Sequence, residues 1–165
     1  RGSITISAQT HVYLGGEPVL NITTVAGGGA IRIMGGGGIF NVAAQGITNV
    51  TGDAIILEAA GGPIGTAQQF LTLDLHGGSL TARARQDIFL TESAGDLSLD
   101  TVYSETGSGE IRADQSLLNG VGGGEWNIKV NSMTLIAGAS VGTDGNPVNT
   151  DLPLLDSAGP GAGLI

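Results

Sequence analysis

The sequence predicts an all-β fold in which short parallel strands wind into a β-solenoid of about seven coils. Three observations support this prediction. Apolar and polar residues alternate through many short segments, and no window of a dozen residues shows the i, i+3, i+4 apolar spacing of a helix. Glycine makes up 30 of the 165 residues, far above its usual share of about 7%, and separates the segments where turns are expected. A long segment also recurs within the chain, which is typical of solenoids.

The repeat has two copies, residues 54–75 (AIILEAAGGPIGTAQQFLTLDL) and residues 133–152 (MTLIAGASVGTDGNPVNTDL). Its Ile-Gly-Thr motif at 64–66 maps onto Val-Gly-Thr at 141–143, an offset of 77 positions (141 − 64). In each copy an apolar strand leads through small residues to this motif and then to a second alternating segment. With coils of roughly 20–25 residues, the offset corresponds to three or four coils.

In chain order, further strands are expected wherever the alternation is clear. They are residues 4–6, 12–14, 19–25, 31–33, 39–42, 47–50, 71–75, 80–85, 88–90, 97–99, 111–113 and 128–130. Successive side chains of a strand point to opposite faces, and five basic residues fall on the face opposite the apolar ones. These residues are Arg32, Arg83, Arg85, Arg112 and Lys129. Because only 4% of residues are aromatic, the interior is expected to be a narrow stack of Ile, Leu, Val and Ala.

A β-sandwich is the alternative architecture, but its hairpins should show turns such as Asp-Gly. Asp-Gly occurs once, at 144–145, whereas the common junctions are Gly-Gly, Ala-Gly and Gly-Asp. The pattern therefore favours a solenoid over residues 1–152. Residues 153–165, rich in Pro and Gly, are expected to form a tail or linker.

The solenoid interpretation makes a prediction about acidic residues one coil apart. Asp87 and Glu110 each precede an inward apolar residue and are 23 positions apart (110 − 87). We expect them on the same face of adjacent coils. Asp74 and Asp96, 22 positions apart (96 − 74), are expected to lie in the same way.

Charge and composition exclude several classes of function. A net charge of −9 argues against nucleic acid and anionic membrane surfaces as partners. The absence of cysteine excludes thiol catalysis, disulfides and cysteine-based zinc sites. No stretch approaches 18 uninterrupted apolar residues, so no membrane insertion is expected. The N-terminus already shows a strand pattern without a signal region, so an exported chain is expected to be an internal segment.

Residues 87–102 (DIFLTESAGDLSLDTV) and 109–116 (GEIRADQS) resemble the repeats of very large secreted bacterial proteins of the filamentous-haemagglutinin-like class. In that class, units of the form Gly-acid-Ile-x-Leu-Thr and acid-Leu-x-Leu-x-x-Val succeed one another. The resemblance covers most of residues 52–152. It implies a right-handed parallel β-helix, export to the cell surface and a role as a rigid rod.

An acid-rich stretch is the first candidate for chemistry, because glycoside hydrolysis uses paired carboxylates. Such an enzyme also needs a cleft with aromatic and basic groups, and the local candidate is Arg112 beside Glu110 and Asp114. We interpret the stretch instead as a solvated acidic face. Its acids are Asp87, Glu92, Asp96, Asp100, Glu105, Glu110 and Asp114.

Calcium favours oxygen ligands and is an alternative for these carboxylates or for residues 144–146 with Asp151. No calcium-binding nonapeptide repeat is present, and turns use the same residue types. His11 and His76 lie 65 positions apart (76 − 11), without the spacing of a metal motif. We therefore assign no catalytic, cofactor-binding or metal-binding residue and expect no cofactor. The glycine runs at 35–38 and 120–124 are interpreted as turns.

The expected function is that of a non-enzymatic structural segment of a secreted bacterial surface rod or fibre. Its expected partners are further β-helix segments, in the same chain or end to end between chains. Two alternatives remain. One is an adhesin module that binds a glycan or host protein, which exposed aromatic clusters would favour. The other is a β-helix polysaccharide lyase or hydrolase.

Overall fold

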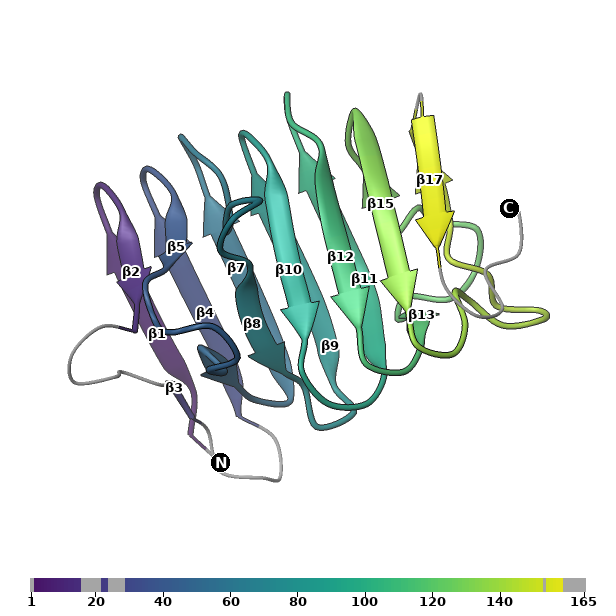
Figure 1. The fold of residues 1–165 in the computed structure, drawn as a ribbon, viewed down its shortest axis with the longest axis horizontal. Coiled ribbons are helices and arrows are strands. Elements are labelled where there is room, and N and C mark those ends of the chain that lie inside the picture. Colours follow the sequence, from purple (N-terminus) through teal and green to yellow (C-terminus); the bar gives the residue numbers. More distant parts are fainter. Residues whose placement is uncertain (1, 16–21, 24–28, 153, 159–165) are drawn as a thin grey trace.

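The computed structural model describes residues 2–15, 22–23, 29–152 and 154–158. Within these ranges every regular element is a strand and none is a helix. The strands form long parallel sheets that face each other across an apolar core, in about six turns of a β-solenoid (Figure 1). The predicted fold class is therefore confirmed, with a number of turns close to the seven expected.

One long sheet, called sheet A here, contains eight strands, all paired in parallel. They are β1 (Ile4–Ala8), β4 (Ala30–Gly35), β7 (Ala54–Ala59), β9 (Ser79–Ala84), β11 (Leu97–Ser104), β14 (Ile128–Lys129) and β16 (Thr150–Asp151), with β13 (Leu117–Asn119) beside β11.

The opposite sheet, called sheet B, contains seven parallel strands. They are β3 (Ile22–Thr23), β6 (Val50–Thr51), β8 (Leu71–Asp74), β10 (Ile88–Glu92), β12 (Gly109–Ala113), β15 (Ser132–Ala137) and β17 (Leu154–Ala158). A short pair, β2 (Val12–Leu14) with β5 (Ile39–Asn41), accompanies it. β17 lies in the segment expected to be a tail, so the sheet extends to Ala158. Residues 159–165 lie outside the described residues.

The strand register agrees with the expected coil length. Ile31, Ile55 and Leu80 are aligned across three neighbouring strands, at sequence offsets of 24 and 25 (55 − 31 and 80 − 55). Residues one coil apart thus stack directly over one another.

The two acidic pairs behave differently. Asp87 immediately precedes β10, and Glu110 lies in β12 of the adjacent coil. Both lie on the side away from the core, as expected, although the residue aligned with Glu110 is Phe89. The expectation for Asp74 and Asp96 is wrong, because Asp74 belongs to sheet B and Asp96 lies in the turn that precedes β11 of sheet A. Coils of unequal length shift the register, so a fixed spacing does not identify neighbours.

The two copies of the internal repeat lie on opposite sheets. The first copy begins with β7 in sheet A, and the second begins with β15 in sheet B. They are separated by three and a half turns, counted from β7 through β9 and β11 to β14 and then across to β15. In both copies the motif glycine, Gly65 or Gly142, has a positive φ (67° and 71°), a conformation that favours glycine.

The core is aliphatic, as the composition predicted. Every fully or nearly buried hydrophobic residue in the described chain is Ile, Leu, Val, Ala or Met. All six aromatic residues (one Trp, two Tyr and three Phe) are exposed or half-exposed instead. The aromatic side chains of this protein therefore lie on its surface and not in its core.

Two buried asparagine pairs connect the coils. Asn49 is fully buried, and its Nδ2 donates to Asn41 Oδ1 (2.8 Å) and to the Leu14 carbonyl (3.3 Å). Its Oδ1 accepts from the Thr72 amide (2.8 Å), while Asn41 Nδ2 donates to the Phe70 carbonyl (2.8 Å). One pair of side chains thereby satisfies backbone groups of three successive coils.

The second pair, Asn119 and Asn127, reproduces this network at a sequence offset of 78 (119 − 41 and 127 − 49). Asn127 Nδ2 donates to Asn119 Oδ1 (2.9 Å) and to the Leu99 carbonyl (2.7 Å), and its Oδ1 accepts from the Asn149 amide (2.9 Å). The internal repeat therefore begins upstream of residue 54, in the first asparagine pair.

Replacing Asn127 by Ala is expected to lower the free energy of unfolding by about 2–4 kcal/mol, because the Asn149 amide loses its acceptor and a buried cavity replaces the amide side chain. The Leu99 carbonyl loses one of its two donors and keeps the Gly120 amide. Asn131→Ala is the matched control, because Asn131 is exposed and donates one hydrogen bond, to the Thr106 carbonyl. Urea denaturation followed by circular dichroism measures both. Equal losses for the two variants would show that the buried network contributes little.

Candidate binding groove

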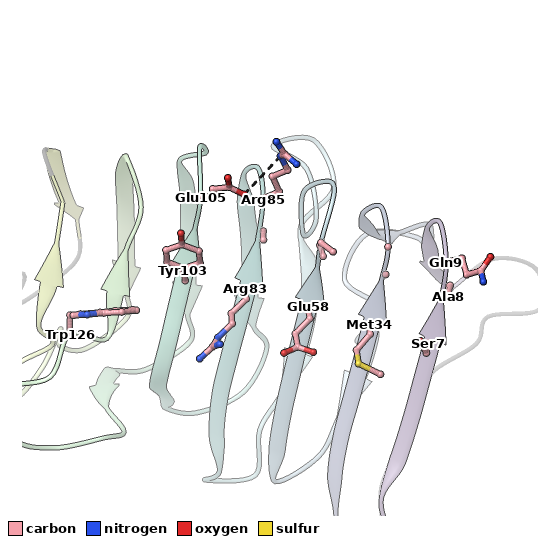
Figure 2. Close-up of a pocket in the computed structure, with 15 residues that line it drawn as sticks. Ser7, Ala8, Gln9, Met34, Glu58, Arg83, Arg85, Tyr103, Glu105 and Trp126 are labelled. Atoms are coloured by element: carbon pink, nitrogen blue, oxygen red, sulfur yellow. Dashed lines mark ion pairs between the residues drawn. The ribbon is translucent and has the colours of Figure 1, made fainter.

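An open groove of about 870 Å³ lies on the outer face of sheet A and is the candidate functional site. It crosses β1, β4, β7, β9 and β11 and reaches Trp126 (Figure 2). It is lined by Ser7, Ala8, Gln9, Met34, Gly35, Gly36, Glu58, Ala59, Ala60, Arg83, Ala84, Arg85, Tyr103, Glu105 and Trp126.

The parallel register builds this groove from two rows of outward side chains. One row contains the register partners Ser7, Met34, Glu58, Arg83 and Tyr103, one from each of five neighbouring strands (Figure 2). The second row lies just beyond the strand ends and contains Gln9, Gly36, Ala60, Arg85 and Glu105. Between the rows lie Ala8, Gly35, Ala59 and Ala84, which are inward positions of their strands, so no outward side chain stands there to fill the space. The groove therefore runs along the solenoid axis.

The charged groups of the groove are of both signs. Glu58 accepts a hydrogen bond from Arg32 of the adjacent coil (2.7 Å), and Arg85 lies 3.9 Å from Glu105. Arg83 forms no ion pair with any carboxylate of the described residues. Arg83 is exposed, and its guanidinium extends toward the side of Tyr103 and Trp126, so its donors are open to a ligand (Figure 2). The five basic residues expected opposite the core are all exposed, as predicted.

Aromatic side chains close one end of the groove. Trp126 follows the glycine run of the loop between β13 and β14, and its ring centroid lies 6.4 Å from that of Tyr103. Lys129 Nζ lies 5.9 Å from the Trp126 ring and donates to Asp151 (2.6 Å), which raises the pKa of Lys129. Trp126 keeps 37% of its surface exposed, so a stacking face remains open.

A second aromatic group lies away from the groove, on β2 and β5. Tyr13 stacks on Phe40 with ring centroids 5.5 Å apart, and His11 packs edge-on against Phe40. His11 Nδ1 accepts a hydrogen bond from the Gly38 amide (2.8 Å). His11 therefore has a structural contact in the turn at residues 35–38.

The residues suggested for polysaccharide cleavage are only partly assembled. Arg112 contacts Glu110 and lies 4.2 Å from the centroid of the Phe70 ring. Asp114 lies beyond the end of β12 and is 3.5 Å from the Gly95 amide. The hollow of about 450 Å³ beside Arg112 is lined by neither Glu110 nor Asp114. The structure thus does not place two carboxylates and an arginine around one cleft here.

One acid of the predicted solvated face is instead buried. Glu92 occupies the inward position that follows Ile88 and Leu90 in β10 and is 1% exposed. Its Oε1 accepts from the Leu75 amide (3.0 Å), whereas Oε2 has no partner among the described residues. Desolvation by burial raises the pKa of Glu92 from 4.5 to about 8. The period-two pattern already placed residue 92 inside, so the sequence contained this signal.

The oxygen-rich residues considered for calcium have structural partners. The turn 143–146 closes with backbone hydrogen bonds between Thr143 and Asn146, and Asp151 binds Lys129. Within the described residues, no group of three His, Cys, Asp or Glu side chains is arranged to hold a metal ion.

Comparison with protein-family models, with curated proteins and with solved structures gave no match to this chain. The described part of the chain contains no helix that is long and apolar enough to cross a membrane.

Proposed function

We propose that the chain is a structural segment of a rod or fibre and stacks end to end with further β-solenoid, in the same or neighbouring chains. The observation that carries this proposal is the location of the incompletely buried core residues. Ile4, Ile6 and Ala8 of the first coil remain partly exposed, whereas Ile31 and Ile33, one coil inward, are 0% exposed. At the opposite end the partly buried residues are Val141 and Leu152.

The sheet edges support the same proposal. Among the described residues, β1 pairs only with β4 and β17 pairs only with β15, so each strand has one edge without a partner strand. Such edges bind another strand readily. Because all strands run parallel, a second solenoid placed on one end continues both sheets in the same direction. This head-to-tail contact does not close on itself and produces an extended rod.

The proposal includes export to the cell surface and a role without catalysis. The resemblance of residues 87–116 to giant secreted bacterial proteins supports it, and so does the net charge of −9, which favours solubility.

The unpaired edge of β1 can be blocked selectively. Ala8 faces β4, because its carbonyl accepts from the Gly36 amide (2.8 Å). Backbone groups alternate in direction along a strand, so the amide of Thr5 points to the free edge. Thr5→Pro therefore removes a donor for an incoming strand and leaves the pairing with β4 intact.

We expect the mean mass of the wild-type chain in sedimentation equilibrium to rise with concentration, and Thr5→Pro to weaken this association at least tenfold. Thr5→Val is the matched control, because it keeps the amide and should associate like the wild type. Circular dichroism and thermal unfolding verify that both variants fold. A wild-type chain that stays monomeric at millimolar concentration, or equal association of all three proteins, would overturn the proposal.

A further inference from the structure

We propose that the groove on sheet A binds a linear, uncharged polysaccharide that lies along the solenoid axis, with Tyr103 and Trp126 as its stacking end. This inference concerns the side of the solenoid and goes beyond the proposed stacking of its ends. It rests on the shape, hydrogen-bonding groups, charge and aromatic residues of the groove.

The shape of the groove fits an extended polymer. Its side chains come from five neighbouring strands in register, so similar positions recur at every strand spacing of about 4.8 Å, over about 20 Å in all. The groove is open along its length, and Gly35, Gly36, Ala59 and Ala60 line it with little side-chain bulk. A chain of similar units can lie along such a surface, with successive units meeting successive coils.

The polar groups of the groove match hydroxyl groups, which both donate and accept hydrogen bonds. Arg83 offers only donors and Glu58 only acceptors, whereas Gln9, Ser7 and the Tyr103 hydroxyl offer both. No hydrogen bond to another described residue occupies the side chains of Arg83, Gln9 or Ser7. These groups exchange water for ligand hydroxyls without breaking internal contacts.

The charge of the groove favours an uncharged ligand. Glu58 and Glu105 balance Arg83 and Arg85, and the whole chain carries −9. An anionic polysaccharide would meet two carboxylates in the groove and a negative protein around it, while a cationic ligand would meet two guanidinium groups. A neutral polymer meets neither repulsion.

The aromatic residues at the end of the groove provide an apolar platform. Tyr and Trp combine a broad apolar face with a polar edge, so they suit ligands that carry both apolar faces and hydroxyls. Tyr103 and Trp126 lie in adjacent coils with their rings inclined at 41°, and Trp126 stays open to solvent. Met34 and the exposed Ala60 add apolar surface further along the groove.

An extended peptide is the competing occupant. Extended peptides commonly gain affinity by adding a strand to a free sheet edge. The groove lies on the face of sheet A, where β4, β7, β9 and β11 are paired on both sides. A peptide in the groove would have no backbone partners of this kind, so the observations favour the polysaccharide.

The single tryptophan makes the test direct, because Trp126 fluorescence reports on this groove alone. Cellohexaose is titrated into the folded chain, with a heparin hexasaccharide and an unstructured polar peptide as comparison ligands. We expect a saturable change in Trp126 fluorescence with cellohexaose, and weaker binding of both comparison ligands.

Tyr103→Ala should weaken cellohexaose binding at least tenfold. Tyr13→Ala is the matched control, since it removes an exposed tyrosine outside the groove and should leave affinity within twofold. Isothermal titration calorimetry on the same variants gives a readout that does not depend on fluorescence. Preference for heparin or for the peptide would overturn the proposal. No binding of cellohexaose at millimolar concentration, or equal binding by both variants, would also overturn it.

Discussion

Replacing Gly78 by alanine is expected to disrupt the solenoid and to lower the free energy of unfolding by about 3 kcal/mol or more. Gly78 immediately precedes β9, where the chain of one coil presses against the coil before it. A Cβ atom at this position would lie 1.2 Å from the carbonyl oxygen of Asp53. That oxygen also accepts a hydrogen bond from the Ser79 amide (2.9 Å). If the two coils moved apart to relieve the clash, this first hydrogen bond of the strand would break.

Gly124→Ala is the matched control for this prediction. A Cβ at Gly124 meets no atom within 4 Å, and its φ is not in the positive region. We expect the free energy of unfolding of this variant to lie within about 1 kcal/mol of the wild-type value. Thermal and urea unfolding compare the two. A Gly78→Ala chain as stable as Gly124→Ala would mean that the coils are not packed as described.

The buried carboxyl of Glu92 is expected to make stability depend strongly on pH. Its folded-state pKa of about 8 lies above the usual 4.5, so the folded chain holds this proton more tightly than the unfolded chain. The folded state is therefore favoured fully below about pH 4.5. Stability then decreases as the pH rises towards 8, and changes no further above it. The shift corresponds to an upper limit on the order of 5 kcal/mol.

Glu92→Gln removes this titration while keeping the shape of the protonated acid and the acceptor for the Leu75 amide. We expect the variant to match the wild type near pH 4.5 and to exceed its stability by several kcal/mol at pH 8.5. Urea denaturation at half-unit pH steps measures the difference, and subtraction of the two curves cancels all other titrating groups. Parallel curves between pH 5 and 8 would contradict the burial of a protonated Glu92.

The architecture could be predicted because strand periodicity is a local property. Ile88 and Leu90 alternate with Phe89 and Thr91, and this pattern alone identifies a strand with one buried face. The same rule places Glu92 inside. The many acids around Glu92 in the sequence suggest a solvated position instead, but the direction of its side chain determines its burial.

The groove and the asparagine pairs could not be predicted in the same way, because both depend on which residues stack across coils. Met34, Glu58 and Arg83 share one row only because the intervening coils give sequence offsets of 24 and 25 (58 − 34 and 83 − 58). Elsewhere, loops such as 120–127 change the coil length and shift the register. A fixed spacing then fails, as it does for Asp74 and Asp96, because the coil between β8 and β10 has a sequence offset of 19 (92 − 73). The sequence does contain the constant offset between the two asparagine pairs. The role of these asparagines becomes visible only from their hydrogen bonds to three successive coils.

Electron microscopy of the negatively stained chain over a range of concentrations tests the central claim most directly, because end-to-end stacking changes particle length alone. We expect unbranched rods of constant width that lengthen with protein concentration and stay short for Thr5→Pro. Separate particles of one short length at every concentration would contradict the claim that the solenoid ends are built to receive further β-solenoid.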